Sequence, residues 1–139
     1  MNISYNYQNY QNINHQYVTE EEIKEFCMNY YNSMSISGLC KLLPIFDPYA
    51  ECYDNNDILI GAYYVMCKYG SEYIVKFAYG EIYYSYMFVG NFLMLQAHGT
   101  YQKVFFGDIY GQVSKFTETF ILDKINNKFV IKKHIFYEF

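Results

Sequence analysis

The chain has 139 residues, of which 53% are hydrophobic and 22% aromatic, and its formal net charge is −4. This length suits a single domain, and no apolar run reaches the ~18 residues needed to cross a bilayer, which excludes a membrane-spanning helix. All 10 basic residues are lysines, so this acidic chain lacks the clustered, fork-shaped cations that bind phosphate groups, and we expect no nucleic-acid partner.

Four cysteines lie 12 to 15 residues apart without a CxxC pair: Cys27, Cys40, Cys52 and Cys67. This spacing is typical of buried free thiols in a reducing compartment, and neither of a disulfide framework nor of a metal site. No secretory leader precedes them, so we expect an intracellular protein, cytoplasmic or nuclear, without metal or cofactor.

Residues 1–17 are dominated by Tyr, Asn and Gln, with Ile3 and Ile13 as their aliphatic residues beyond Met1. Such a composition cannot bury enough surface to offset the entropy lost on ordering. We therefore expect a disordered tail over 1–17 and one folded domain over 18–139.

The first helix has a clear start in the sequence. Thr19 and Glu22 have the spacing of a capping box, and Val18 and Ile23 take the positions of a hydrophobic staple. One apolar stripe at helical spacing then predicts the face that packs on the core: Ile23, Phe26, Cys27, Tyr30, Tyr31 and Met34.

Two shorter helices are expected next. Ser37 can cap a leucine-rich helix, which Pro44 limits to about two turns. A third helix is expected over 62–69, because Gly61 and Gly70 bracket an apolar segment there.

The rest of the chain is predicted to form strands separated by turn signals. Two short strands are expected within 49–60, on either side of an Asp-Asn-Asn-Asp turn at 54–57. Longer strands are expected at 72–79, 81–89, 91–99, 112–123 and 128–138, with turns at Gly80, Gly90-Asn91, Gly107-Asp108, Gly111 and Asn126-Asn127. Helices followed by an antiparallel meander predict an α+β fold, with three N-terminal helices against one face of a strongly curved sheet.

Several strands are apolar on both faces. Tyr84 and Tyr86 alternate with Tyr83 and Met87, for example, whereas a sheet with one wet face would alternate apolar and polar residues. The helices can cover only one face. We therefore expect the other face to pack on a second copy of the chain in a homodimer.

Three stretches together resemble the nuclear-transport-factor-2-like family: FCMNYY at 26–31, Gly61 before the third helix, and FTETFIL at 116–122 followed by NNKFVIKKHIFYEF. The last two strands are the most specific part, since His134-Ile135-Phe136 stands where the family's aromatic hairpin ends. The resemblance covers about residues 19–139. It implies a cone, in which a curved antiparallel sheet wraps three helices, and a family divided into binding and catalytic branches.

The binding branch implies a dimerisation module that takes Phe-Gly-containing peptides in an aromatic groove. By position, the groove residues would be Phe26, Ile45 and Phe136, and they would act by desolvating a phenyl ring in a preformed pocket. The alternative is that all three are plain core residues. The Ran GTPase, which nuclear transport factor 2 carries, is a doubtful partner, because Asp108 is the one acid at 101–111, where the family is acidic.

The catalytic branch implies acid-base groups inside the cone. His98, on a central strand, is the candidate base, with Tyr30, Tyr63 and Tyr84 as possible hydrogen-bond partners. The alternative is that His98 is a structural residue.

Three other residues that could titrate, two glutamates and one histidine, are expected to be structural. Glu118 and Glu81 have Lys115 and Lys76 nearby, a pattern that predicts solvated cross-strand charge pairs. His134 lies beside two lysines and does not have the pattern of a metal ligand.

The sequence therefore favours a non-enzymatic protein-binding and dimerisation module, acting in transport or ribonucleoprotein assembly. A glycine-rich phosphate loop, a GxSxG elbow and an HExxH motif are all absent from the sequence. The alternative is a small cone-fold isomerase, dehydratase or cyclase, because enzymes of that kind also lack linear motifs.

Overall fold

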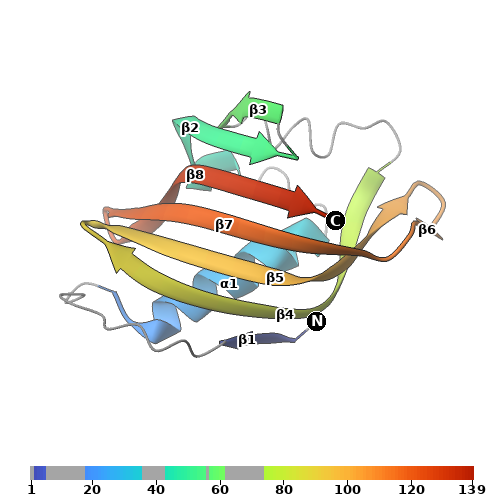
Figure 1. Ribbon diagram of the computed structural model, residues 1–139, viewed down its shortest axis with the longest axis horizontal. Coiled ribbons are helices and arrows are strands. Elements are labelled where there is room, and N and C mark those ends of the chain that lie inside the picture. Colours follow the sequence, from blue (N-terminus) through green and yellow to red (C-terminus); the bar gives the residue numbers. More distant parts are fainter. Residues whose placement is uncertain (1, 6–17, 36–42, 56, 62–73) are drawn as a thin grey trace.

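The computed structural model describes residues 2–5, 18–35, 43–55, 57–61 and 74–139. Over these residues a strongly curved sheet lies against one α-helix (Figure 1). The elements in chain order are β1 (Ile3–Tyr5), α1 (Glu20–Ser35), the 3-10 turn η1 (Leu43–Ile45), β2 (Phe46–Asp54), β3 (Asp57–Ile60), β4 (Ile74–Val89), β5 (Phe92–Phe105), β6 (Ile109–Tyr110), β7 (Ser114–Ile125) and β8 (Lys128–Glu138).

The α+β class is confirmed, and the described part of the chain contains one α-helix where three were expected. The predicted second helix falls mainly on residues 36–42, and the predicted third helix on 62–69, both outside the described residues. Pro44 lies within the short 3-10 turn η1, which leads directly into β2.

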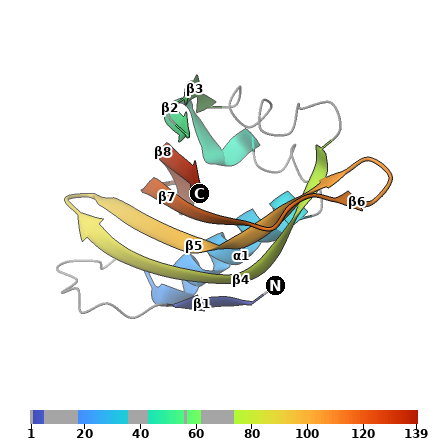
Figure 2. The ribbon, with the colours of Figure 1, turned by 45° about the vertical axis from the view of Figure 1, so that its right-hand side comes forward.

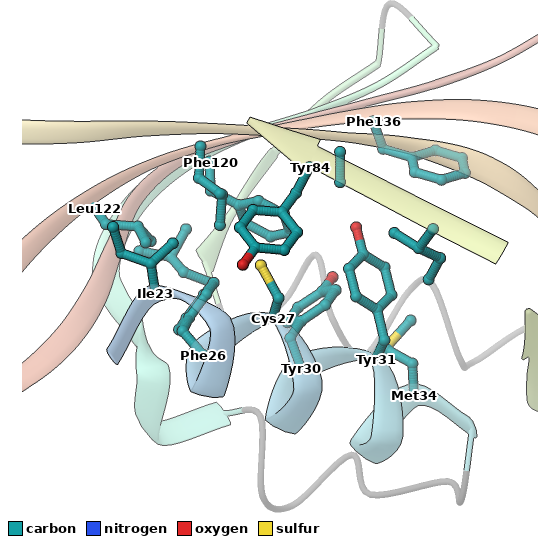
Figure 3. Packing of buried hydrophobic residues seen from close by; sticks show 14 of the residues in the cluster. Ile23, Phe26, Cys27, Tyr30, Tyr31, Met34, Tyr84, Phe120, Leu122 and Phe136 are labelled. Atoms are coloured by element: carbon teal, nitrogen blue, oxygen red, sulfur yellow. The ribbon is translucent and has the colours of Figure 1, made fainter. Parts of the chain in front are cut away.

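The start of α1 is confirmed. The Glu22 amide donates to Thr19 Oγ1 at 3.2 Å, and the Ile23 amide donates to the Thr19 carbonyl at 3.2 Å. All six residues of the predicted stripe are buried, with exposed fractions from 0% for Tyr31 to 8% for Phe26. Figure 3 shows these side chains pointing from α1 toward the concave face of the sheet, where they meet Tyr84, Phe120, Leu122 and Phe136.

The sheet is mixed, and the predicted purely antiparallel meander was wrong in this respect. Its strand order is β1-β4-β5-β7-β8-β2-β3, with β6 paired to β5. The β2–β8 and β1–β4 pairs are parallel, and the other pairs are antiparallel. The last strand therefore returns beside β2, a long-range pairing that no local turn signal in the sequence encodes.

The predicted turn at Gly80 is instead a bulge inside one long strand. Residues 74–89 form a single strand, β4, whose register against β5 shifts between Tyr79 and Ile82. A side-chain Cβ at Gly99 on β5 would lie 2.5 Å from the Glu81 carbonyl oxygen, so the backbones approach closely only because residue 99 is glycine. Bulges bend a strand and increase its twist, and Figure 2 shows the resulting curvature of β4 and β5 around α1.

The predicted turns at Gly90-Asn91, Gly107-Asp108 and Asn126-Asn127 are confirmed, whereas Gly111 lies in an irregular segment between β6 and β7. Gly90, Gly107 and Asp108 have positive φ, as do Asn126 and Asn127 in the β7–β8 turn. Asn55, between β2 and β3, also has a left-handed backbone with φ of 47°. These residue types tolerate that conformation, which is why the sequence located the turns correctly.

The expected disordered tail contains a strand at its beginning. Residues 3–5 form β1, which pairs in parallel with β4, Ile3 opposite Ile82 and Tyr5 opposite Tyr84. The tail composition did not predict this, because the stabilising partners are contributed by β4. Residues 6–17 lie outside the described part of the chain.

No helix among the described residues is long and apolar enough to cross a membrane.

Candidate functional site

A groove of about 640 Å³ lies beside α1. One face of α1 forms its first wall, Ile45 of η1 its second, and the turn between β7 and β8 its third. The described lining residues are Glu22, Glu25, Phe26, Asn29, Tyr30, Asn32, Ser33, Ile45, Asn127, Lys128 and Phe129.

The floor of this groove is aromatic. The Phe26 ring packs edge-on against Phe129 at 5.8 Å and against Phe120 at 5.7 Å, centroid to centroid. Phe26 itself is 8% exposed, while Ile45 and Phe129 are half-buried. The groove therefore offers ring edges and one aliphatic side chain over a preformed, packed base.

The rim of the groove is polar. It carries amide and hydroxyl side chains from α1 together with Glu25 and Lys128. At one end Glu22 forms an ion pair with Lys124, with 2.6 Å between Oε2 and Nζ. The hydrogen bond from Lys124 holds the pKa of Glu22 below its usual value, so Glu22 stays ionised. A ligand here would meet an apolar floor between hydrogen-bonding edges.

The structure brings together two of the three predicted peptide-binding residues. Phe26 and Ile45 both line the groove. Phe136 does not: it stacks on Phe116 at 5.9 Å, packs edge-on against Tyr101 at 5.7 Å, and is 5% exposed. Its place in the groove wall is taken by Phe129, at the other end of the same strand, β8.

A second feature is a polar cluster sealed within the core. Glu118 on β7 is 1% exposed and His134 on β8 is 0% exposed. The distance from Glu118 Oε2 to His134 Nε2 is 2.5 Å, and the hydroxyls of Tyr30 and Tyr31 donate to the same carboxylate at 3.2 and 2.8 Å. Tyr30 and Tyr31 of α1 thus donate to the Glu118 carboxylate of β7, which lies beside the His134 imidazole of the neighbouring strand β8.

Burial and the Glu118 charge perturb the groups around this cluster. Desolvation, followed by the nearby Glu118 carboxylate, raises the pKa of Tyr31 well above its ordinary value. The same two causes raise the pKa of the Cys27 thiol. Both groups are therefore held in their neutral forms, and Tyr31 acts as a hydrogen-bond donor.

The sequence-based interpretation of Glu118 as a solvated partner of Lys115 was wrong. Phe116, Glu118 and Phe120 alternate with exposed or half-buried residues along β7, so Glu118 shares the inward phase with two phenylalanines. The period of two along the strand could have revealed this. His134 was likewise missed, because its neighbouring lysines obscured the inward phase of β8.

The structure does not assemble the alternative catalytic set. His98 is exposed on the outer face of β5 and stacks on Tyr83, with ring centroids 5.5 Å apart. Tyr30 and Tyr84 are buried on the opposite, concave face. Tyr63 lies outside the described residues. The alternation of a strand sends His98 and its neighbour Ala97 to opposite faces, so His98 cannot reach the interior.

The described residues contain no group of three His, Cys, Asp or Glu side chains that could hold a metal ion. Cys27 and Cys52 are both buried, and Cys40 and Cys67 lie outside the described part of the chain.

Comparisons with known proteins support the fold. No protein-family model matches the sequence, and neither does any curated protein. Among solved structures, nuclear transport factor 2 from Cryptosporidium parvum is similar, with 18% identity, 92% of this chain and 98% of that chain covered, and a TM-score of 0.65.

Two further solved structures cover both functional branches. The yeast UBP3-associated protein Bre5 is 22% identical, with 88% of this chain and 98% of that chain covered and a TM-score of 0.63. A putative scytalone dehydratase from Novosphingobium aromaticivorans is 11% identical, with coverages of 86% and 83% and a TM-score of 0.68. The chain therefore has the nuclear-transport-factor-2-like fold, which is shared by binding proteins and enzyme-like proteins.

Proposed function

We propose that this chain is a non-enzymatic, homodimeric protein-binding module that takes a short peptide with an aromatic anchor in the groove beside α1. The observation that carries the proposal is the aromatic floor of that groove, where the rings of Phe26 and Phe129 pack edge to face under a polar rim. A Phe-Gly-containing peptide suits this shape, because its phenyl ring would be desolvated against ring edges while its backbone meets amide and hydroxyl groups.

The filled interior favours binding over catalysis. The described residues of the core are closely packed rings, and the groups that could serve as acid and base, Glu118 and His134, are sealed at 1% and 0% exposure. Tyr30 lies between the groove and the cluster, because it lines the groove and its hydroxyl donates to Glu118. A substrate would therefore have to displace Tyr30 before it could reach either group.

The outer face of the sheet supports the homodimer. It exposes apolar side chains from three strands: Tyr83 at 38%, Val89 at 52%, Phe92 at 40%, Ile135 at 37% and Tyr137 at 48%. Exposed apolar side chains gathered on one face of a sheet are typical of a contact surface. A second copy of the same face would cover it with an isologous interface.

The setting we propose is intracellular, in transport or ribonucleoprotein assembly, with recognition of a protein and not of nucleic acid. Ran remains a doubtful partner on this proposal. Asp108 is the one acid of residues 101–111 and lies in the β5–β6 turn, where an acidic surface would be needed.

The groove is tested by titrating a fluorescein-labelled peptide with a single Phe-Gly step against the full chain and against Phe129→Ala. Loss of the ring should weaken binding about tenfold or more, because affinity concentrates in the anchor pocket. Tyr110→Ala is the matched control: it removes an exposed ring from β6, away from both the groove and the dimer face, and should leave the affinity unchanged. Equal affinities of all three proteins, or no binding by any, would refute the groove assignment.

The dimer is tested by light scattering. The unchanged chain should scatter as twice 16.7 kDa, and Ile135→Lys should convert it toward a 16.7 kDa particle. Ile58→Lys on β3, which alters an exposed isoleucine away from that face, should stay dimeric. A 16.7 kDa particle from the unchanged chain at micromolar concentration would contradict the proposal.

A second candidate function rests on the Glu118–His134 pair. A carboxylate, an imidazole and two phenols inside the cone are the groups that a small acid-base enzyme would use. Solvent deuterium exchange into enolisable cyclic ketones, lost in His134→Gln, would favour an enzyme over the binding module.

A further inference from the structure

The outer edge of β4 is occupied by the first residues of the chain itself. Among the described strands, β1 alone pairs with this edge, and it does so over three residues of a 16-residue strand. The Ile82 amide donates to the Asn2 carbonyl at 2.8 Å, so the β1–β4 ladder begins one residue before β1. The pairing is parallel, with Ile3, Ser4 and Tyr5 opposite 82–84.

The side chains of β1 divide cleanly between core and solvent. Ile3 and Tyr5 are half-buried and pack against the hydrophobic core, whereas Ser4 is exposed. The Tyr5 ring lies 5.6 Å from the ring of Tyr84 and 5.2 Å from the ring of Tyr86. Tyr5 thus rests on two tyrosines that β4 already presents, near the point where the Tyr86 hydroxyl donates to Glu20 of α1 at 3.0 Å.

β1 is attached to the sheet through far fewer paired residues than any of the long strands. β1 is three residues long, has a strand on one side only, and is joined to Val18 by 12 residues, 6–17. Short strands with few buried side chains open at far lower free energy than the core. An exposed strand edge with apolar pockets at alternate positions is, in turn, a template for an incoming extended peptide.

We propose that the edge of β4 over 82–84 is a strand-accepting binding site, and that residues 2–5 are its internal occupant. The occupant defines the ligand chemistry: an extended segment running parallel to β4, with an aliphatic and an aromatic side chain two residues apart and a small polar residue between them. The partner is a segment of this chemistry in another protein. It displaces β1 and exposes Tyr84 and Tyr86 to the new side chains.

The experiment uses the full chain carrying Ile3→Asp and Tyr5→Asp, which should release β1 and leave β4 intact. The probe is a fluorescein-labelled peptide of residues 1–8, MNISYNYQ, followed by fluorescence anisotropy. Tethering holds β1 at an effective concentration on the order of millimolar, so the probe should bind the released chain at least tenfold more tightly than the unchanged chain. A probe with Ser4→Lys should bind within twofold, whereas one with Tyr5→Asp should fail.

Amide hydrogen exchange gives a second readout that needs no variant. In the unchanged chain, the Ile82 amide should exchange at least tenfold faster than the slowest amides of β5, because β1 detaches without global unfolding. Excess probe should restore Ile82 protection in the doubly substituted chain.

Three results would overturn the proposal. The first is equal affinity of the probe for the released and unchanged chains. The second is Ile82 exchange as slow as that of β5, which would make β1 a permanent part of the sheet. The third comes from mixing isotope-labelled and unlabelled copies of the chain: the Ile82 amide of one copy is protected by residues 2–5 of another copy. That result would make the occupant a second copy of this chain.

Discussion

The sealed cluster around Glu118 leads to a quantitative prediction for Glu118→Leu. The substitution keeps the side chain's approximate volume and removes the acceptor of two phenolic hydrogen bonds and the partner of His134. Removing one member of a buried, hydrogen-bonded polar pair costs about 3–5 kcal/mol of unfolding free energy. For a chain of this length that corresponds to a fall in Tm on the order of 10–20 °C.

The matched control is Glu81→Leu. Glu81 is exposed on β4 and accepts a hydrogen bond from the Tyr83 hydroxyl, so it is also a strand carboxylate bonded to a phenol. Because water can replace that bond, we expect its loss to cost less than about 1 kcal/mol. Glu118→Gln, which keeps one acceptor oxygen, should lie between the two, at about 1–3 kcal/mol.

The measurement is urea unfolding of all three variants and the unchanged chain, followed by far-ultraviolet circular dichroism. The slopes of the transitions should agree, so that differences in midpoint report stability. Equal costs for Glu118→Leu and Glu81→Leu would refute the reasoning, because they would mean that water reaches the Glu118 carboxylate in the folded chain.

Three further predictions concern other sites. Burial raises the pKa of Tyr84 to about 12, whereas the unfolded value is near 10. The stability that the neutral Tyr84 side chain contributes to the fold is therefore complete below pH 10 and is lost as pH rises toward 12. In a titration followed at 295 nm, Tyr84→Phe should lack a step near pH 12. Gly99→Ala should destabilise the fold by about 1–3 kcal/mol in the same urea assay, because its Cβ would lie 2.5 Å from the Glu81 carbonyl oxygen, and an unchanged midpoint would disprove the close approach. The hydrogen bond from Lys124 lowers the pKa of Glu22, so the stability that this ion pair contributes is present above pH 4.5 and is lost as pH falls through the folded-state pKa. Lys124→Met should flatten this dependence of stability on pH. Identical acid-unfolding profiles of the two proteins would rule out the ion pair as the source.

Much of the local structure was predictable from short stretches of sequence. The start of α1 depends on Thr19 and Glu22, three residues apart, and its buried face repeats with helical period. The turns at Gly90 and at Asn126-Asn127 follow from residues that tolerate positive φ. In each case the cause lies within a few residues of the effect, so one stretch of sequence contains all the information needed.

The candidate site was predictable only in part. Phe26 belongs to the α1 stripe, and its position in the groove followed from the resemblance. Phe129 and Phe136 lie on the same strand with similar surroundings in sequence, and only the packing of β8 against α1 decides which ring reaches the groove. His98 looked well placed in the sequence, yet the phase of β5 directs it outward.

The sequence by itself determined the α+β class, the amphipathic α1 and the turns, because these depend on local backbone preference and on periodicity. The tertiary structure alone decided three things: that β8 lies beside β2, that β1 covers the edge of β4, and that Glu118 meets His134 and the two tyrosines of α1. The physical reason is that each is a contact between residues distant along the chain. Tyr31 and Glu118, for example, are 87 residues apart, and only the curvature of the sheet around α1 brings them to 2.8 Å.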